Sequence, residues 1–100
     1  VVHLDLSSFE SIRKSAKLLT NCYPKINVLI NNAGVFHLFD NPEVCIPSAK
    51  SNVEQSTCVN TCILVNHLGT FLFTRLLLPK LEKSSSKSNP SRIFNINSRS

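Results

Sequence analysis

The feature that most restricts the fold is a short, almost continuously apolar segment, residues 26–30, which follows an amphipathic helical pattern over residues 8–19. Phe9, Ile12 and Ala16 recur at helical spacing, and basic residues occupy the opposite side of that helix. Uninterrupted apolar strands are typical of sheets that are covered on both faces. Because a helix between two strands is the usual crossover between parallel neighbours, this order predicts an α/β fold with a parallel sheet.

Two more strands are predicted near the ends of the chain. Residues 1–6 are β-branched at their start and resemble the end of a strand, and residues 92–97 form another short apolar segment. Ser7, with Glu10 three residues later, predicts a capping box at the start of the first helix. The sequence therefore predicts the order β-α-β-α-β.

A long and largely buried helix is predicted over residues 53–81, since its second half is dominated by leucine and phenylalanine. Pro79 is expected to kink or end this helix. The residues from Gly34 to the start of the helix show no regular period, and we interpret them as a loop. Residues 83–90 are rich in serine and predict an exposed connection.

Composition argues against several classes of function. The formal charge of +5 comes from scattered basic residues, which argues against a nucleic-acid partner. Residues 63–81 are interrupted by polar side chains and are judged too polar to span a membrane, so no membrane contact is expected from this segment. The four cysteines form no Cys-x-x-Cys pair, and they predict reduced intracellular thiols and no metal site.

Three polar positions fall where such a sheet would bind a ligand. The run Asn31–Gly34 follows a predicted strand, where small residues allow a ligand to approach the backbone. Taken alone, this run is better explained as an ordinary turn. Asn66 interrupts the most apolar helix and needs hydrogen-bond partners, which a neighbouring loop or its own helix can supply. Ser98 follows the last strand and can stabilise charge on a substrate oxygen, or act only as a loop residue.

Together these positions resemble the short-chain dehydrogenase/reductase family, most closely its retinol-dehydrogenase-like branch. The resembling segments, in order, are Asp5-Leu6 with the helix 8–19, Val28–Val35, Val65–Phe71 and Ser91–Ser98. The resemblance implies a partial Rossmann-like, doubly wound parallel sheet that contains strands 3, 4 and 5 of the family fold. Residues 1–100 would be the central part of one NAD(P)-binding domain, without its glycine-rich N-terminal βαβ unit and its C-terminal tyrosine/lysine segment.

The resemblance also assigns roles to residues. The aspartate that matches Asp5 contacts the adenine ring, and the Asn-Asn-Ala-Gly run passes the adenine ribose and ties the sheet together. In the family, the asparagine that matches Asn66 helps to hold a water in the proton relay, and the serine that matches Ser98 positions and polarises the reacting group. The implied cofactor-binding residues are Asp5, Leu6, Asn32, Ala33, Gly34 and Ile96, and the implied catalytic residues are Asn66 and Ser98.

The implied chemistry is hydride transfer between a nicotinamide cofactor and an alcohol or carbonyl, with a retinoid, steroid or other lipophilic compound as the substrate. NADP is favoured over NAD. The family's acid/base tyrosine is missing, because Tyr23 is the only tyrosine and Asn27 stands where the paired lysine would be. Asn97 occupies a position where relatives commonly have serine, and residues 36–64 form a longer segment than in close relatives.

An alternative hypothesis is a non-catalytic truncated relic or interaction module that retains the middle of the fold. Under either hypothesis residues 1–100 alone are expected to be inactive, and to aggregate because apolar faces and strand edges are uncovered. A homo-oligomer would use the long helix over 53–81. The location is expected to be intracellular, either cytoplasmic or associated with the endoplasmic reticulum.

Overall fold

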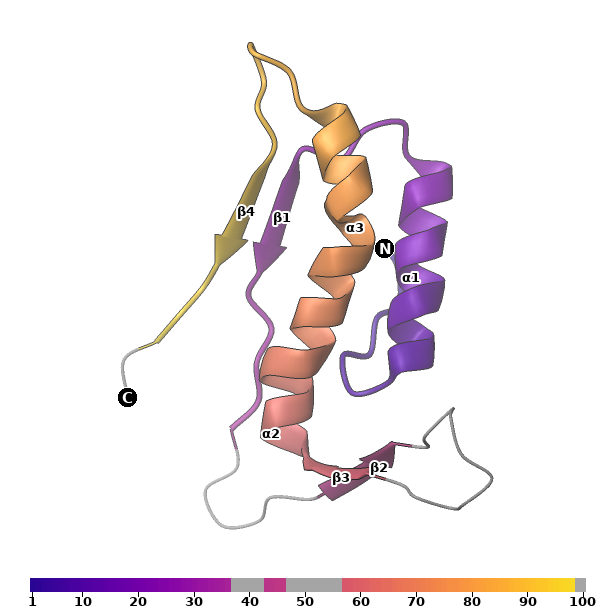
Figure 1. The fold of residues 1–100 in the computed structure, drawn as a ribbon, viewed down its shortest axis with the longest axis vertical. Coiled ribbons are helices and arrows are strands. Elements are labelled where there is room, and N and C mark those ends of the chain that lie inside the picture. Colours follow the sequence, from indigo (N-terminus) through magenta and orange to yellow (C-terminus); the bar gives the residue numbers. More distant parts are fainter. Residues whose placement is uncertain (37–42, 47–56, 99–100) are drawn as a thin grey trace.

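The computed structural model describes residues 1–36, 43–46 and 57–98 (Figure 1). Three helical segments follow one another without a break and form a single run over residues 61–84. The elements in chain order are α1 (Phe9–Cys22), β1 (Val28–Asn31), β2 (Glu43–Ile46), β3 (Thr57–Asn60), α2 (Thr61–Ile63), the π-helical segment η1 (Leu64–Gly69), α3 (Thr70–Ser84) and β4 (Arg92–Asn95).

A parallel pair of strands, β1 and β4, forms the sheet that positions the site. The register runs from Val28 opposite Arg92 to Asn31 opposite Asn95. Hydrogen bonds extend the pairing past both ends, because the Arg92 N–H donates to Asn27 O at 2.8 Å and the Ile96 N–H donates to Asn31 O at 3.0 Å. The parallel sheet predicted from the sequence is confirmed, and its helical crossover is the run over residues 61–84.

The hydrophobic core lies where α1, α3 and β1 meet. Figure 1 shows α1 and α3 side by side, with β1 next to α3. Leu29 is the buried residue of β1, and its two strand neighbours on the opposite face are exposed. The core therefore covers one face of the strand pair. Its buried members are Ile12, Ala16, Leu29, Phe73, Leu77 and Leu81.

The N-terminus of α1 is capped by Ser8 and not by the predicted Ser7/Glu10 box. Ser8 Oγ accepts a hydrogen bond from the Ser11 N–H at 3.2 Å. Ser7 instead donates to Asp5 from both its N–H and its hydroxyl, and Glu10 pairs with Lys14 at 2.7 Å on the exposed side of the helix. The helix consequently begins one residue later than the capping box would require.

The C-terminus of α3 is tied to the start of β1 through a buried serine. Ser84 Oγ accepts from the Ile26 N–H at 2.9 Å and donates to Lys80 O at 2.7 Å. Asn27 Nδ2 donates to Ser84 O at 2.8 Å, and the Ser91 hydroxyl donates to Leu81 O at 2.6 Å. These bonds fix the amino ends of both strands against the end of the helix.

The predicted first strand does not form. Residues 1–6 have no strand structure, because a strand requires a hydrogen-bonded neighbour and none of the described segments pairs with them. Side chains of α1 bind this segment instead. The buried Ser15 hydroxyl donates to His3 O, and Ser11 Oγ accepts from the Asp5 N–H at 2.9 Å. The observed order therefore lacks the first β of the predicted β-α-β-α-β pattern.

The predicted loop contains an antiparallel pair, β2 with β3. The helix consequently starts at Thr61 and not near 53–59, of which residues 53–56 lie outside the described part of the chain. Asn60 Oδ1 sets this start by accepting from the Cys62 N–H at 2.9 Å. Cys22 and Cys62 are free thiols, but Cys58 is disulfide-bonded, so the prediction of reduced thiols is wrong for Cys58.

Pro79 does not end the helix, and α3 continues to Ser84. Leu77 and Leu81, on either side of Pro79, are each only 2% exposed, and their burial stabilises helix geometry across the proline. The run Thr61–Ser84 is, by length and composition alone, apolar enough to cross a membrane, so the judgement that it is too polar was wrong. Only 28% of its most apolar stretch is buried, so the extensive burial predicted for this helix is not found, although Phe73, Leu77 and Leu81 pack in the core.

Candidate active site

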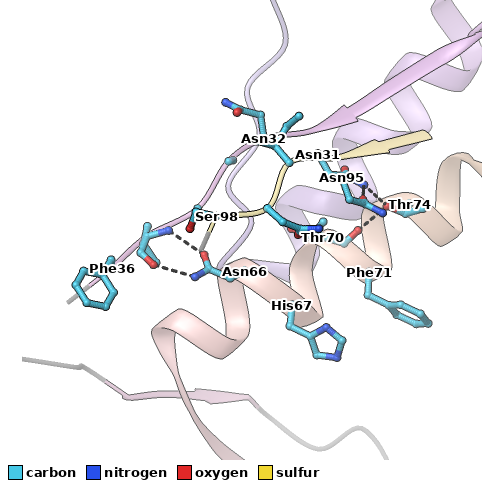
Figure 2. A pocket seen from close by; sticks show the side chains of 15 residues that line it. Asn31, Asn32, Phe36, Asn66, His67, Thr70, Phe71, Thr74, Asn95 and Ser98 are labelled. Atoms are coloured by element: carbon cyan, nitrogen blue, oxygen red, sulfur yellow. Dashed lines mark hydrogen bonds between the residues drawn. The ribbon is translucent and has the colours of Figure 1, made fainter. Parts of the chain in front are cut away.

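A cavity of about 950 Å³ opens at the carboxyl ends of β1 and β4 (Figure 2). Residues 31–36 form one wall, residues 95–98 form another, and the side of η1 and α3 forms the third. Its volume lies within the range of pockets that bind small molecules. The edge where parallel strands end is also where open α/β sheets bind their ligands.

The π-helical segment η1 presents Asn66 to this cavity. Asn66 Oδ1 accepts from the Val35 N–H at 2.8 Å, and Asn66 Nδ2 donates to Val35 O at 2.8 Å (Figure 2). The carboxamide thus replaces a strand partner for Val35 and holds the loop after β1 against the helix. Of the roles considered for Asn66, the structure supports its holding of a neighbouring loop.

Glycine allows close approach at two points around Asn66. A Cβ on Gly34 would stand 3.4 Å from Asn66 Oδ1, which is a tight contact but an achievable one. A Cβ on Gly69 would collide with the backbone oxygen of Leu6 and would also crowd Leu64 O. The absence of a side chain at Gly69 therefore allows the loop that precedes α1 to lie directly against the helix.

Residues from both predicted groups, the cofactor-binding residues and the catalytic residues, meet in the cavity. Asn32, Ala33 and Gly34 are exposed along one wall, and Ser98 is exposed on another. Ile96, which was predicted to bind the cofactor, lies in the same wall as Ser98, as does Asn97. The structure therefore brings together the predicted residues that follow β1, those that follow β4, and Asn66.

Asp5 and Leu6 lie outside this lining. Asp5 Oδ1 accepts from the Ser7 hydroxyl at 2.6 Å and from the Ser7 N–H at 2.9 Å. The hydrogen bond from the Ser7 hydroxyl lowers the pKa of the Asp5 carboxyl most, followed by the bond from the Ser7 N–H, and His3 makes a smaller contribution. Asp5 therefore does not share this cavity with Asn32, Asn66 and Ser98.

Sequence reasoning missed several polar residues of the site. Thr70, Thr74 and Asn95 all line the cavity. Thr70 and Thr74 follow Asn66 at intervals of four residues, so a polar stripe on an otherwise apolar helix was the signal that could have found them. Asn95 had no such signal, because its contacts depend on the register of β4. Within the described residues, no group of three potential metal ligands gathers here or elsewhere.

Comparison with known proteins identifies the family. A family model described as short chain dehydrogenase, adh_short, matches residues 1–100. The chain belongs to the short-chain dehydrogenase family. The resemblance stated from the four sequence segments is thereby confirmed.

Individual members of the short-chain dehydrogenase family match nearly the whole chain. Human retinol dehydrogenase 13 is 40% identical over 96 residues, which is 96% of this chain and 24% of that protein. Human retinol dehydrogenase 11 is 43% identical over 95 residues, which is 95% of this chain and 25% of that protein. Protochlorophyllide reductase of Avena sativa is 34% identical over 84 residues, which is 84% of this chain and 24% of that protein.

A solved structure supports the fold. The Pseudomonas aeruginosa RhlG/NADP active-site complex aligns with a TM-score of 0.65 and 28% sequence identity, over 95% of this chain and 33% of that chain. The partial Rossmann-like architecture is consistent with this match. The chain spans about a quarter of the length of the curated relatives it matches.

Proposed function

We propose that residues 1–100 are the central part of an NAD(P)-dependent oxidoreductase that transfers hydride between nicotinamide and an alcohol or carbonyl. One observation supports this most directly. A single cavity at the carboxyl edge of the sheet is lined by residues 32–34, Asn66 and Ser98. These are the positions to which the family resemblance gives cofactor and catalytic roles.

The residues present fit a nicotinamide cofactor. Asn32, Ala33 and Gly34 expose backbone and small side chains beside the cavity, which allows a ribose to approach closely. Ile96 would contact the cofactor from the opposite wall. We retain Asp5 and Leu6 as contacts for the adenine end, outside the cavity itself. The NADP complex among the similar structures favours NADP over NAD.

Ser98 would act on the substrate oxygen. Its exposed hydroxyl can hydrogen-bond a carbonyl or alcohol oxygen and stabilise the charge that develops there. The cofactor, when bound, would supply or accept the hydride. Asn66 would keep the cofactor-side loop at a fixed distance from the helix. The resemblance implies that Asn66 also helps to hold a water of the proton relay.

The family's acid/base tyrosine is not supplied by the described residues. Tyr23 follows the C-terminus of α1, is exposed, and is not part of the cavity lining. Residues 1–100 therefore provide walls and an orienting hydroxyl, and we propose that they are inactive alone.

The proposed substrate is a small lipophilic alcohol or carbonyl compound, such as a retinoid or a steroid. Phe36 and Phe71 line the cavity and are 79% and 60% exposed, so they offer apolar surface to such a compound. Similarity to two human retinol dehydrogenases points the same way. We also propose an intracellular location. A homo-oligomer would form through the exposed side of the helical run over 61–84.

The decisive test uses the complete natural protein that contains residues 1–100. Nicotinamide absorbance should change when the protein is given NADPH and a retinoid aldehyde, or NADP⁺ and the alcohol. Ser98→Ala should lower kcat by about 100-fold or more, which is the usual cost of losing a donor to a developing oxyanion. Ser88→Ala removes an exposed hydroxyl in the serine-rich connection and should leave kcat unchanged.

The same experiment separates the main proposal from the alternative of a non-catalytic relic or interaction module. No substrate-dependent absorbance change across a broad panel of alcohols and carbonyls would support the alternative. Equal activity in Ser98→Ala and Ser88→Ala would show that turnover does not use this cavity.

A further inference from the structure

Asn95 lies at the end of β4, three residues before Ser98, and faces Asn31 of β1 in the strand register. Asn31 Nδ2 donates to Asn95 Oδ1 at 2.9 Å and to Thr74 Oγ1 at 3.0 Å (Figure 2). A single amide group thus connects the ends of both strands to α3. Beyond this point both chains leave the sheet and form the walls of the cavity.

The direction of these hydrogen bonds follows from the helix. The Thr74 hydroxyl donates its hydrogen to Thr70 O at 2.8 Å, so its oxygen can only accept from Asn31. Asn31 must therefore present its NH₂ group, and both of its hydrogens are used. Asn95 must in turn present its carbonyl oxygen, because Asn31 has only a donor to offer on this side.

The bond to Asn95 lies beside the last backbone link between the strands. The Ile96 N–H donates to Asn31 O at 3.0 Å, and none of the residues described beyond it pairs with β1. Asn95 is exposed, so its side-chain bond contributes little to the core. Its effect is local, at the point from which residues 96–98 extend to Ser98.

From this arrangement we infer that Asn95 is a positioning residue, which fixes Ser98 relative to the cofactor-side loop by accepting a hydrogen bond from Asn31. The expected effect of Asn95 on catalysis rests on the proposed function. The expected effect of Asn95 on the strand ends does not. The family roles described above include the Asn-Asn-Ala-Gly run and Ser98, and they do not include Asn95.

The structural test measures hydrogen exchange at single amides in the complete natural protein that contains residues 1–100. Asn95→Leu has nearly the shape of asparagine but no acceptor, and should raise the exchange rate of the Ile96 amide about five- to tenfold. Asn95→Asp keeps an acceptor oxygen and should stay close to the unsubstituted protein. The Arg92 amide, bound to Asn27 O at the other end of β4, is the internal reference and should not change.

Two results of this experiment would overturn the inference. If the Ile96 and Arg92 amides speed up together in Asn95→Leu, the residue stabilises the whole fold and has no local positioning role. If neither amide changes, the Asn31–Asn95 bond does not hold the strand ends.

Kinetics then test the consequence for catalysis. Asn95→Leu should lower kcat about tenfold, which is the change in rate expected when one hydrogen bond that positions Ser98 is lost. The KM for cofactor should change little. Asn95→Asp should recover most of the loss. In a Ser98→Ala background, Asn95→Leu should cause no further loss, since it acts through Ser98. Additive losses would contradict the inference, whereas a parent protein without any activity would refute only the proposed function.

Discussion

At the scale of single residues, Gly69 illustrates how close contact between two backbone segments requires glycine at one position. It lies in η1, where the oxygen of Leu6 occupies the space that a Cβ would need. Glycine normally lowers the stability of a helix by about 1 kcal/mol relative to alanine. Here that cost is offset because the helix and the loop before α1 can lie in direct contact.

Gly69→Ala should therefore destabilise the protein by about 3 kcal/mol, at the upper end of what overpacking costs, because two backbone segments must separate. Gly34→Ala is the matched control, since its Cβ would meet only the end of the Asn66 side chain at 3.4 Å. Denaturant unfolding of the complete natural protein measures both. Equal losses in the two variants would show that the Leu6 contact is not tight in solution.

Asp5 should make the turn before α1 sensitive to acid. The two bonds from Ser7 lower the pKa of the Asp5 carboxyl in the folded state, so the carboxylate stabilises the turn above the ordinary pKa of aspartate. That contribution should disappear as the pH falls through the lowered pKa, below about pH 4. The Ser7 amide should exchange faster in that range, relative to its intrinsic rate. Asp5→Asn keeps an acceptor and should abolish this pH dependence, and its persistence in the variant would exclude Asp5 as the cause.

The residues of the candidate site were predictable only in part. The resemblance in four segments located Asn66, Ser98 and residues 32–34, and the structure brings all of them to one cavity. Asp5, to which the resemblance gives an adenine contact, lies outside this cavity, and its side chain binds its own turn. Asn95 could not have been predicted, since its partner is set by a strand register that no local pattern encodes.

At the scale of elements, the junction between α3 and β1 depends on Ser84. Its side chain is 7% exposed and satisfies the Ile26 N–H just before the strand. Ser84→Ala should cost about 1–3 kcal/mol of unfolding free energy, because a partly buried N–H would lose its acceptor. Ser88→Ala, in the exposed connection, should change the free energy by less than about 0.5 kcal/mol. Similar losses of unfolding free energy in Ser84→Ala and Ser88→Ala would mean that water can replace the Ser84 hydroxyl as the acceptor for the Ile26 N–H.

Elements with strong local patterns were predicted, and those that depend on partners were not. The helix α1 and the strands β1 and β4 follow from the spacing of apolar residues and from the turn-forming residues between these segments. The segment 1–6 has the composition of a strand but no neighbour within the described residues, and the β2–β3 pair lies where no apolar alternation was visible. Pro79 was predicted to kink or end the helix, but α3 continues past it, and the burial of Leu77 and Leu81 on both sides outweighs the cost of the proline.

At the scale of the whole molecule, one face of the strand pair is uncovered by the described residues. Val28, Ile30 and Phe94 are 52%, 59% and 45% exposed, and they follow the alternation that places Leu29 in the core on the other face. The strand over residues 26–30 is thus not covered on both faces within the described residues, and the uncovered apolar face expected for residues 1–100 alone is present there. Exposed apolar patches of this kind promote association.

Residues 1–100 expressed alone should therefore associate or precipitate at micromolar concentrations. Replacing Ile30 and Phe94 together by threonine should shift sedimentation profiles towards monomer, because both side chains lie on the uncovered face. Leu18→Gln removes an exposed leucine from α1 and serves as the control, with little expected effect. Cooperative thermal unfolding of a monomer by the unsubstituted segment would contradict this prediction.

The pairing of β1 with β4 also determines when the cavity can come into existence. Asn31 and Asn95, whose side chains join the two walls, are 64 positions apart in the chain. Closing so long a loop has an entropic cost and slows formation of the contact. During synthesis, residues 32–36 leave the ribosome well before residues 95–98. The cavity wall formed by the first segment therefore exists without the second wall until the later segment has been made. A molecule that needs both walls can therefore recognise only a chain in which this closure is complete, and it would stabilise the finished fold without guiding its early steps.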